Sequence, residues 1–316
     1  MRRVTTIAEV RRQVAAWRRE ALTVGFVPTM GALHAGHLAL VSEAAVRADR
    51  VVVSIFVNPT QFDRADDLAA YPRDLDGDER ALAGLGSAAP DLAFAPAAAE
   101  LYPTPPLTSV RVAELGDHLC GASRPGHFDG VGLIVTKLLS IVRPDLAVFG
   151  RKDRQQLEIV RRLVADLDLG VDIVAAPTVR EEDGVALSSR NRRLGPDQRR
   201  SARALPHALR AAVEVARAAR AAATPLEPEA ALVAAREVLA RAGVEVEYLD
   251  AVEPGTLQPT RAPVAAGDRV VLAVAAYVGP VRLIDNVELG DRDDEQRLLA
   301  ATADVPASAQ QRPRGG

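Results

Sequence analysis

The sequence is poor in cysteine and in long apolar runs. Its 316 residues contain one cysteine, Cys120, which excludes an intrachain disulfide and any metal site built from several cysteines. No apolar run reaches the roughly 18 to 20 residues that cross a membrane, and the N-terminal segment is too charged for a signal peptide. These absences predict a soluble protein of the reducing cytoplasm that has no membrane partner.

The sequence also lacks a basic excess and has few aromatic residues. It has 39 Lys and Arg against 42 Asp and Glu, whereas a protein that grips nucleic acid through its phosphates carries a basic footprint. We therefore expect no nucleic-acid partner. Aromatic residues make up 3% of the chain, so its core must be built from Ala, Val and Leu. The length predicts about two domains.

Short apolar runs alternate with helical patterns through the first half of the chain. Strand-like runs cover residues 22–27, 51–57, 91–94, 145–149 and 171–174, and residues 36–49, 129–142 and 153–166 have helical spacing. Strands that alternate with helices form βαβ units around a parallel sheet, which binds ligands at the carboxyl ends of its strands. The sequence therefore predicts an α/β domain over residues 1–180.

The pattern changes in the second half. Helical segments are expected over residues 198–222 and 227–242, and strands over 244–251, 269–278 and 282–287. This order predicts a smaller α+β domain over residues 181–290. Residues 291–316 are charged and then rich in Ala, Pro, Gln and Arg, so we expect them to form a disordered tail.

A glycine- and histidine-rich loop follows the first predicted strand. Gly31 and Gly36 allow the backbone to approach a ligand closely, and the following helix offers unpaired N–H groups to a phosphate. His34 and His37 lie on one side of the helix entry, where two imidazoles can donate to phosphate oxygens as charge develops. A helix-capping pair or half of a metal site is the alternative, although the metal lacks further ligands at suitable spacing.

Polar residues also follow the later strands. Asn58 and Gln61 offer amides that suit a ligand with hydroxyl and carboxylate groups, although Asn58 next to Pro59 also suits a turn. Gly150 permits a tight strand-to-helix turn, and Lys152 can hold a phosphate or form a surface pair with its neighbour Asp153. Two further segments are suited to cover a ligand: residues 124–130, which suit an exposed turn nearly as well, and residues 188–191.

Taken together, five segments resemble the pantothenate synthetase (pantoate–β-alanine ligase) family, within the HxGH nucleotidyltransferase-like superfamily. They are Pro28-Thr-Met-Gly-Ala-Leu-His-Ala-Gly-His37, Ser54-Ile-Phe-Val-Asn-Pro-Thr-Gln-Phe62, Arg124-Pro-Gly-His-Phe128, Lys152-Asp-Arg-Gln-Gln156 and Ser188-Ser-Arg-Asn191. The resemblance runs from about residue 1 to residue 289. It implies a Rossmann-like N-terminal domain, a smaller C-terminal lid domain, a cytoplasmic homodimer, and Mg²⁺ used with ATP.

The resemblance also implies a role for each matching residue. His37, His34 and Lys152 would be catalytic, with His37 the proton donor. The ATP site would comprise Met30, Gly31, Ala32, Leu33, His34, Ala35, Gly36, His37, Gly150, Arg151, Lys152, Asp153, Val179, Leu187, Ser188, Ser189 and Arg190. Gln61 would contact pantoate and β-alanine, Gln156 would contact pantoate, and Asp78 would hold Mg²⁺ through water. Asn58, from its place at the end of a strand, is a further candidate for contacting substrate.

The implied reaction condenses ATP, pantoate and β-alanine to pantothenate, AMP and pyrophosphate through pantoyl adenylate. Two departures from the family pattern stand out: Arg151 occupies a position that commonly holds Glu or Gln, and Leu187 replaces a frequent Met. Another HxGH nucleotidyltransferase and a catalytically inactive nucleotide-binding regulator are the alternatives. Pantoate-dependent exchange between ATP and pyrophosphate distinguishes them.

Overall fold

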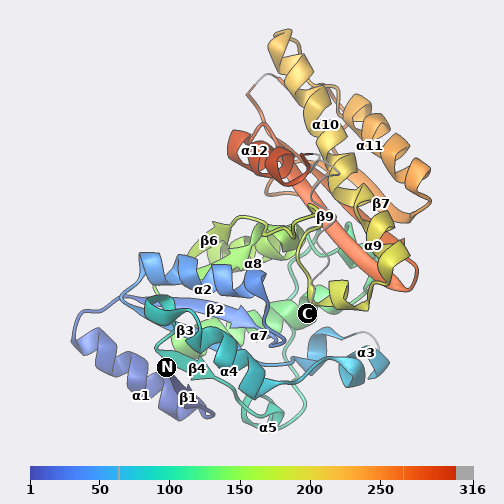
Figure 1. Ribbon diagram of the computed structural model, residues 1–316. Coiled ribbons are helices and arrows are strands. Elements are labelled where there is room, and N and C mark those ends of the chain that lie inside the picture. Colours follow the sequence, from blue (N-terminus) through green and yellow to red (C-terminus); the bar gives the residue numbers. More distant parts are fainter. Residues whose placement is uncertain (63–64, 266, 304–316) are drawn as a thin grey trace. The chain divides into compact units, whose positions relative to one another are not determined.

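A computed structural model describes residues 1–62, 65–265 and 267–303 (Figure 1). The chain divides into two compact units. The first contains Met1–Val179, Ala186–Leu194 and Val252–Pro259, and the second contains Arg180–Val185, Gly195–Ala251 and the described residues from Thr260 onward. The chain therefore passes between the units several times, whereas the sequence predicted a single boundary after residue 180.

A six-stranded parallel sheet forms the centre of the first unit. Its strands are β1 (Arg2–Val4), β2 (Val24–Thr29), β3 (Arg50–Ile55), β4 (Leu92–Phe94), β5 (Leu146–Gly150) and β6 (Asp172–Ala176), in the order β1-β4-β3-β2-β5-β6. Every pair of neighbours is parallel. The predicted Rossmann-like parallel sheet is confirmed, and β1 is an edge strand that the sequence analysis did not predict.

Helices cover the sheet and connect its strands. They are α1 (Ile7–Arg19), α2 (Ala35–Arg47), α3 (Ala65–Ala70), α4 (Leu75–Ala83), α5 (Ala98–Leu101), α6 (Cys120–Ser123), α7 (His127–Val142) and α8 (Arg154–Asp166), with short 3₁₀ turns η1 (Pro59–Gln61), η2 (Gly86–Ala88), η3 (Arg151–Asp153) and η4 (Ser189–Arg193). The helices predicted over residues 36–49, 129–142 and 153–166 are confirmed as α2, α7 and α8. The side chains of Ala65 and Asp67 are outside the description.

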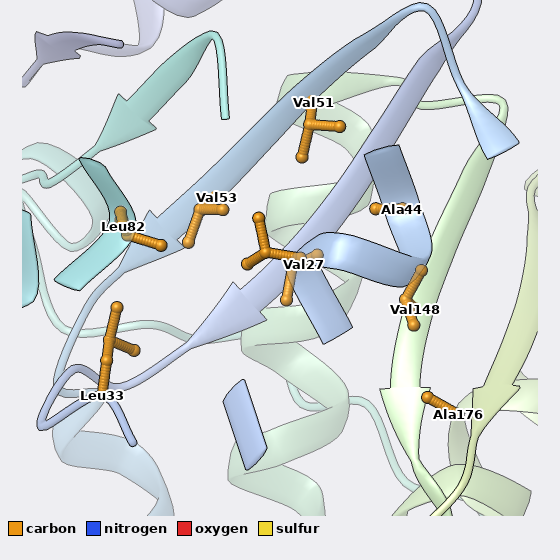
Figure 2. Packing of buried hydrophobic residues seen from close by; sticks show 9 residues of the cluster. Val27, Leu33, Ala44, Val51, Val53, Leu82, Val148 and Ala176 are labelled. Atoms are coloured by element: carbon orange, nitrogen blue, oxygen red, sulfur yellow. The ribbon is translucent and has the colours of Figure 1, made fainter. Parts of the chain in front are cut away.

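Alanine, valine and leucine side chains build most of the core, as the scarcity of aromatic residues predicted. Val27 of β2, Val53 of β3 and Val148 of β5 are fully buried and pack with Ala44 of α2 on one face of the sheet (Figure 2). Their neighbours along each strand point to the other face, because side chains alternate along a strand. Phe26, for example, is fully buried next to Val27.

The strand order creates a switch point between β2 and β5. The chain moves from β2 to β3 on one side of the sheet, whereas β6 lies beyond β5 on the other side. Connections that leave adjacent parallel strands in opposite directions open a crevice at their carboxyl ends. The loop after β2 carries His34, the first turn of α2 carries His37, and the turn after β5 carries Lys152, so the fold brings these two motifs to one crevice.

The second unit combines helices with a three-stranded sheet. It contains α9 (Pro196–Ala202), α10 (Ala204–Ala221), α11 (Pro228–Ala242), β7 (Glu245–Val252), β8 (Val270–Val278), β9 (Val281–Leu289) and α12 (Arg292–Ala301), and the sheet order is β7-β8-β9. Strands β8 and β9 form an antiparallel hairpin. The α+β composition is confirmed, but the single helix expected over residues 198–222 is divided at Arg203.

The prediction of a disordered tail from residue 291 is wrong for its first part. Asp291 caps α12 by accepting the N–H groups of Asp293 and Asp294. Leu298 is 1% exposed, and the buried carboxylate of Glu295 pairs with Arg220 at 2.6 Å. The helix was missed because half of its residues are charged and few are apolar, and its ion pair forms with a residue far along the chain. Residues 304–316 lie outside the described residues.

Candidate active site

Both histidines of the first motif cap helix α2. His34 is the N-cap residue, and its Nδ1 accepts the N–H of Gly36 at 3.2 Å. His37 Nδ1 accepts the N–H of His34 at 3.4 Å, and the ring centroids are 4.0 Å apart. The capping alternative is therefore correct as a description of local structure. It does not exclude a chemical role, because each ring uses only one of its two nitrogens in the cap.

The cap determines the tautomer of both rings. A ring nitrogen that accepts a backbone N–H carries no proton, so the proton of each neutral imidazole is on Nε2. Burial and the charges of neighbouring groups, Lys152 among them, lower the pKa of His34 to about 3. Burial lowers the pKa of His37 to about 4. At neutral pH the site therefore contains two neutral imidazoles that offer Nε2–H donors.

The buried carboxylate of Asp78 holds the same loop through hydrogen bonds. Asp78 of α4 is 5% exposed, and its two oxygens accept the N–H of Ala32 at 3.0 Å and that of Leu33 at 2.7 Å. Gly31 has a φ of +79°, and a Cβ there would lie 2.8 Å from the carboxylate of Asp78. The loop and α4 thus fit together only with glycine at this position.

The turn after β5 brings cationic and anionic groups to the opposite side of the crevice. Lys152 Nζ lies 3.7 Å from a carboxylate oxygen of Asp153, so the surface-pair alternative also describes a contact that exists. The lysine side chain is 17% exposed. Burial raises the pKa of Asp153, whereas the positive charges of Lys152 and Arg190 lower it, and its pKa lies below the usual value. Asp153 is therefore ionised at neutral pH.

The serine-rich segment belongs to the first unit and reaches the same crevice. Ser188 caps η4 and accepts the N–H of Arg190 at 3.3 Å. The N–H of Leu187 donates to the carbonyl of Val179 at 2.9 Å, which joins two segments that the sequence analysis assigned to the nucleotide site. The buried amide of Asn191 donates to the carbonyl of Ala186 at 3.1 Å and holds the turn.

These elements line one cavity of about 260 Å³ in the first unit. Fifteen of the predicted site residues line it: Met30, His34, Gly36, His37, Asn58, Gln61, Gly150, Lys152, Asp153, Gln156, Val179, Leu187, Ser188, Ser189 and Arg190. The other predicted residues, Gly31, Ala32, Leu33, Ala35, Arg151 and Asp78, are not among its lining residues. Gly31 and Asp78 line a neighbouring cavity instead.

Several lining residues carry no sequence signal of their role. Tyr71 lies in the wall, and burial raises the pKa of its hydroxyl. Val131, Ile134, Val135 and Leu138 present one apolar face of α7 to the cavity. Their spacing predicts an amphipathic helix, but only tertiary structure shows that this face borders a cavity as well as the core. Arg124 and His127, from the segment suited to cover a ligand, also line it.

The described residues contain no group of three or more His, Cys, Asp or Glu side chains that could hold a metal ion. Across the same residues, no helix is long and apolar enough to cross a membrane.

A parallel sheet with capped histidines on one side of its switch point and a lysine on the other defines an α/β nucleotide-binding enzyme. Residues 2–288 match the pantoate-β-alanine ligase family. Pantothenate synthetase from Myxococcus xanthus is 47% identical over 93% of this chain and 98% of its own length. Pantothenate synthetase from Thermus thermophilus superposes with a TM-score of 0.81 at 46% identity, covering 92% of this chain and 99% of that chain.

A third relative has been crystallised with ligands. Pantoate-β-alanine ligase from Francisella tularensis, complexed with β-γ ATP and β-alanine, superposes with a TM-score of 0.71 at 33% identity over 90% of this chain and 97% of that chain. The chain belongs to the pantoate-β-alanine ligase family. It is an ATP-dependent ligase, and the resemblance, fold class and enzyme class predicted from the sequence are confirmed.

Proposed function

We propose that the cavity of the first unit binds ATP and pantoate together and forms pantoyl adenylate. One observation carries the proposal: two neutral histidines whose Nδ1 atoms are used in the helix cap, Lys152 and a serine turn line the same cavity as two glutamine amides. Hydrogen-bond donors and a cation suit phosphates, whereas amides suit a ligand with hydroxyl and carboxylate groups. The cavity therefore has complementary ends for the two substrates.

The phosphate end stabilises the charge that develops during adenylation. The pantoate carboxylate attacks the α-phosphorus of ATP, the bond to the bridging oxygen breaks, and pyrophosphate leaves with the electron pair. His34 and His37 donate from Nε2, and Lys152 supplies a positive charge. Donors that are already oriented stabilise a developing oxyanion strongly, because they need no reorganisation during the reaction. Ser188, Ser189 and Arg190 add further donors from the serine turn.

The other end suits pantoate itself. Gln61 and Gln156 offer amides for its hydroxyl and carboxylate groups. The apolar face of α7 suits its two geminal methyl groups, which lose contact with water when they pack against valine, isoleucine and leucine side chains. The amine of β-alanine then attacks the acyl carbon of pantoyl adenylate, AMP leaves, and the amide bond of pantothenate forms. No covalent enzyme intermediate is required.

Magnesium is expected to enter together with ATP. An ion that arrives with ATP takes most of its ligands from phosphate and water. The water-mediated role of Asp78 stays a prediction, and its oxygens already accept two backbone N–H groups. The residue roles in adenylation and in amide formation do not depend on the ion. The homodimer, the cytoplasmic location and the lid role of the second unit also stay predictions, and sedimentation of the purified protein tests the dimer.

Pantoate-dependent exchange of labelled pyrophosphate into ATP tests the proposal. Wild-type protein should catalyse the exchange only when pantoate is present, and His37→Ala should slow it by about a hundredfold or more, the usual scale for such groups. His207→Ala, on α10 of the second unit, is the matched control and should retain wild-type exchange. Tight ATP binding without exchange would instead indicate the inactive regulator.

A further inference from the structure

A chain of hydrogen bonds leads from a backbone carbonyl in α7 to the pantoate end of the cavity. Asn58 Nδ2 donates to the carbonyl oxygen of Gly130 at 3.1 Å. A carbonyl oxygen only accepts hydrogen bonds, so this contact determines which end of the Asn58 amide is the nitrogen. Asn58 is 1% exposed, and its orientation is therefore set inside the protein, not by solvent.

Two hydroxyl groups hold the other end of the same amide. Asn58 Oδ1 accepts from the Tyr102 hydroxyl at 2.9 Å and from the Thr60 hydroxyl at 3.0 Å. The Lys137 ammonium lies 5.2 Å from the centre of the Tyr102 ring, close enough for a cation–π interaction. Burial raises the pKa of Tyr102, so its hydroxyl stays protonated and can donate.

The orientation of Asn58 passes to Gln61. Asn58 Nδ2 also donates to Gln61 Oε1 at 3.1 Å, so the oxygen of the glutamine amide is committed to the protein. The nitrogen, Nε2, is left on the side of Met30, whose Sδ it approaches at 3.0 Å. A thioether is a weak acceptor, which a carboxylate or hydroxyl oxygen of a ligand would replace readily.

The contact between α7 and η1 depends on glycine at position 130. A Cβ on Gly130 would lie 2.2 Å from the carbonyl oxygen of Thr60 and 2.7 Å from the backbone nitrogen of Gln61. Backbone therefore packs directly on backbone here, which brings the Gly130 carbonyl within reach of Asn58. The Gln61 carbonyl in turn lies 2.7 Å from His127 Nδ1, a second link between α7 and the turn.

We propose that Tyr102, Thr60 and Asn58 are positioning residues that fix Gln61 as a hydrogen-bond donor to an acceptor oxygen of pantoate. Asn58, predicted from the sequence to contact substrate, acts here through Gln61. Tyr102 acts through Asn58 and is not among the lining residues of the cavity. The inference rests on the proposed role of Gln61 in binding pantoate. The Gly130 carbonyl fixes the orientation of the Asn58 amide, and Asn58 in turn fixes that of the Gln61 amide.

A double-mutant cycle on pantoate binding tests the relay. Tyr102→Phe removes one donor to Asn58 Oδ1 while keeping the aromatic ring. It should weaken pantoate binding by about fivefold to tenfold in otherwise wild-type protein, the scale of one lost hydrogen bond. In the Gln61→Ala background the same change should alter pantoate affinity less than twofold, because no amide remains to be oriented. Calorimetric titration with pantoate and, separately, with ATP gives both affinities.

Three controls make the cycle decisive. Thr60→Val removes the second hydroxyl and should show the same dependence on Gln61. Tyr277→Phe removes a hydroxyl that contacts Glu247 in the second unit and should leave pantoate affinity unchanged. ATP affinity should stay within twofold of wild type in Tyr102→Phe and Thr60→Val, whereas general damage to the cavity would lower both affinities.

The possible results separate the relay from the role of Gln61. If Tyr102→Phe weakens pantoate binding equally with and without Gln61, or has no effect in either background, the relay is wrong while the binding role of Gln61 stands. If Gln61→Ala itself leaves pantoate affinity unchanged, both the relay and the proposed role of Gln61 are overturned.

Discussion

Removing the carboxylate of Asp78 is the most direct test of how the histidine loop is held. Asp78→Ala deletes the acceptor for two buried backbone N–H groups, those of Ala32 and Leu33. Both residues are 7% exposed, so neither N–H reaches bulk water easily. They lie immediately before His34, and the change should therefore loosen the cap that orients both imidazoles.

The size of the effect follows from these contacts. A buried N–H left without an acceptor costs about 1 to 3 kcal/mol, so two of them set a range of about 2 to 6 kcal/mol. Two features reduce the net cost. Burial raises the pKa of Asp78 more than its hydrogen bonds lower it, so alanine also removes a desolvated charge. Asp78 also lines the neighbouring cavity of about 410 Å³, so water from that cavity can enter the space that the carboxylate leaves. We expect a loss of about 2 kcal/mol by this reasoning, and about 1 kcal/mol for Asp78→Asn, which keeps one acceptor oxygen.

The assay combines urea unfolding with pyrophosphate exchange. Asp78→Ala should lower both the unfolding midpoint and, by about tenfold or more, the exchange rate, since misplaced catalytic groups cost that much. Asp76→Asn is the matched control on the same helix, because the Asp76 side chain is 81% exposed and should tolerate the change. Unchanged stability together with a higher Mg²⁺ requirement in Asp78→Asn would refute the loop-supporting role and favour the metal role.

Two further predictions concern the histidines and the C-terminal helix. Nitrogen NMR of ¹⁵N-histidine-labelled protein should show the Nε2–H tautomer for His34 and His37 and no protonation of either above about pH 5. The folded pKa values of about 3 and about 4 lie below the unfolded value of about 6.5. The two neutral histidines therefore contribute their full stability above pH 6.5, and this contribution is lost as the pH falls from about 6.5 toward the folded pKa values. Titration of either ring near pH 6.5 would contradict this. A chain ending at Gly290 should melt several degrees lower than one ending at Ala303, because it lacks buried Leu298 and the ion pair of Glu295 with Arg220; equal melting temperatures in calorimetry would show that α12 contributes nothing.

Local patterns were sufficient to predict the parallel sheet and most of its helices. The alternation of apolar strands and amphipathic helices is a property of residues that are neighbours in the chain. The glycines and histidines of residues 31–37, from the loop after β2 into the first turn of α2, are also close neighbours in the chain. The ends of parallel strands necessarily meet at one edge of the sheet. For that reason the sequence alone could assign His34, Lys152 and Gln61 to one site before the strand order was known.

Tertiary structure decided what depends on partners far apart in the chain. Asp78 reads as one of several acidic residues on a helix face, and only the fold brings it under Leu33, 45 positions away. From the sequence, Asn58 is a candidate substrate contact or a turn residue, and its place in a relay depends on Tyr102 and on the close approach of Gly130. The sequence of α12 has the composition of a charged tail, and its ion pair between Glu295 and Arg220 forms only in the folded structure. A hydrogen bond or ion pair between distant residues leaves no periodic trace in either segment, so the sequence pattern could not predict it.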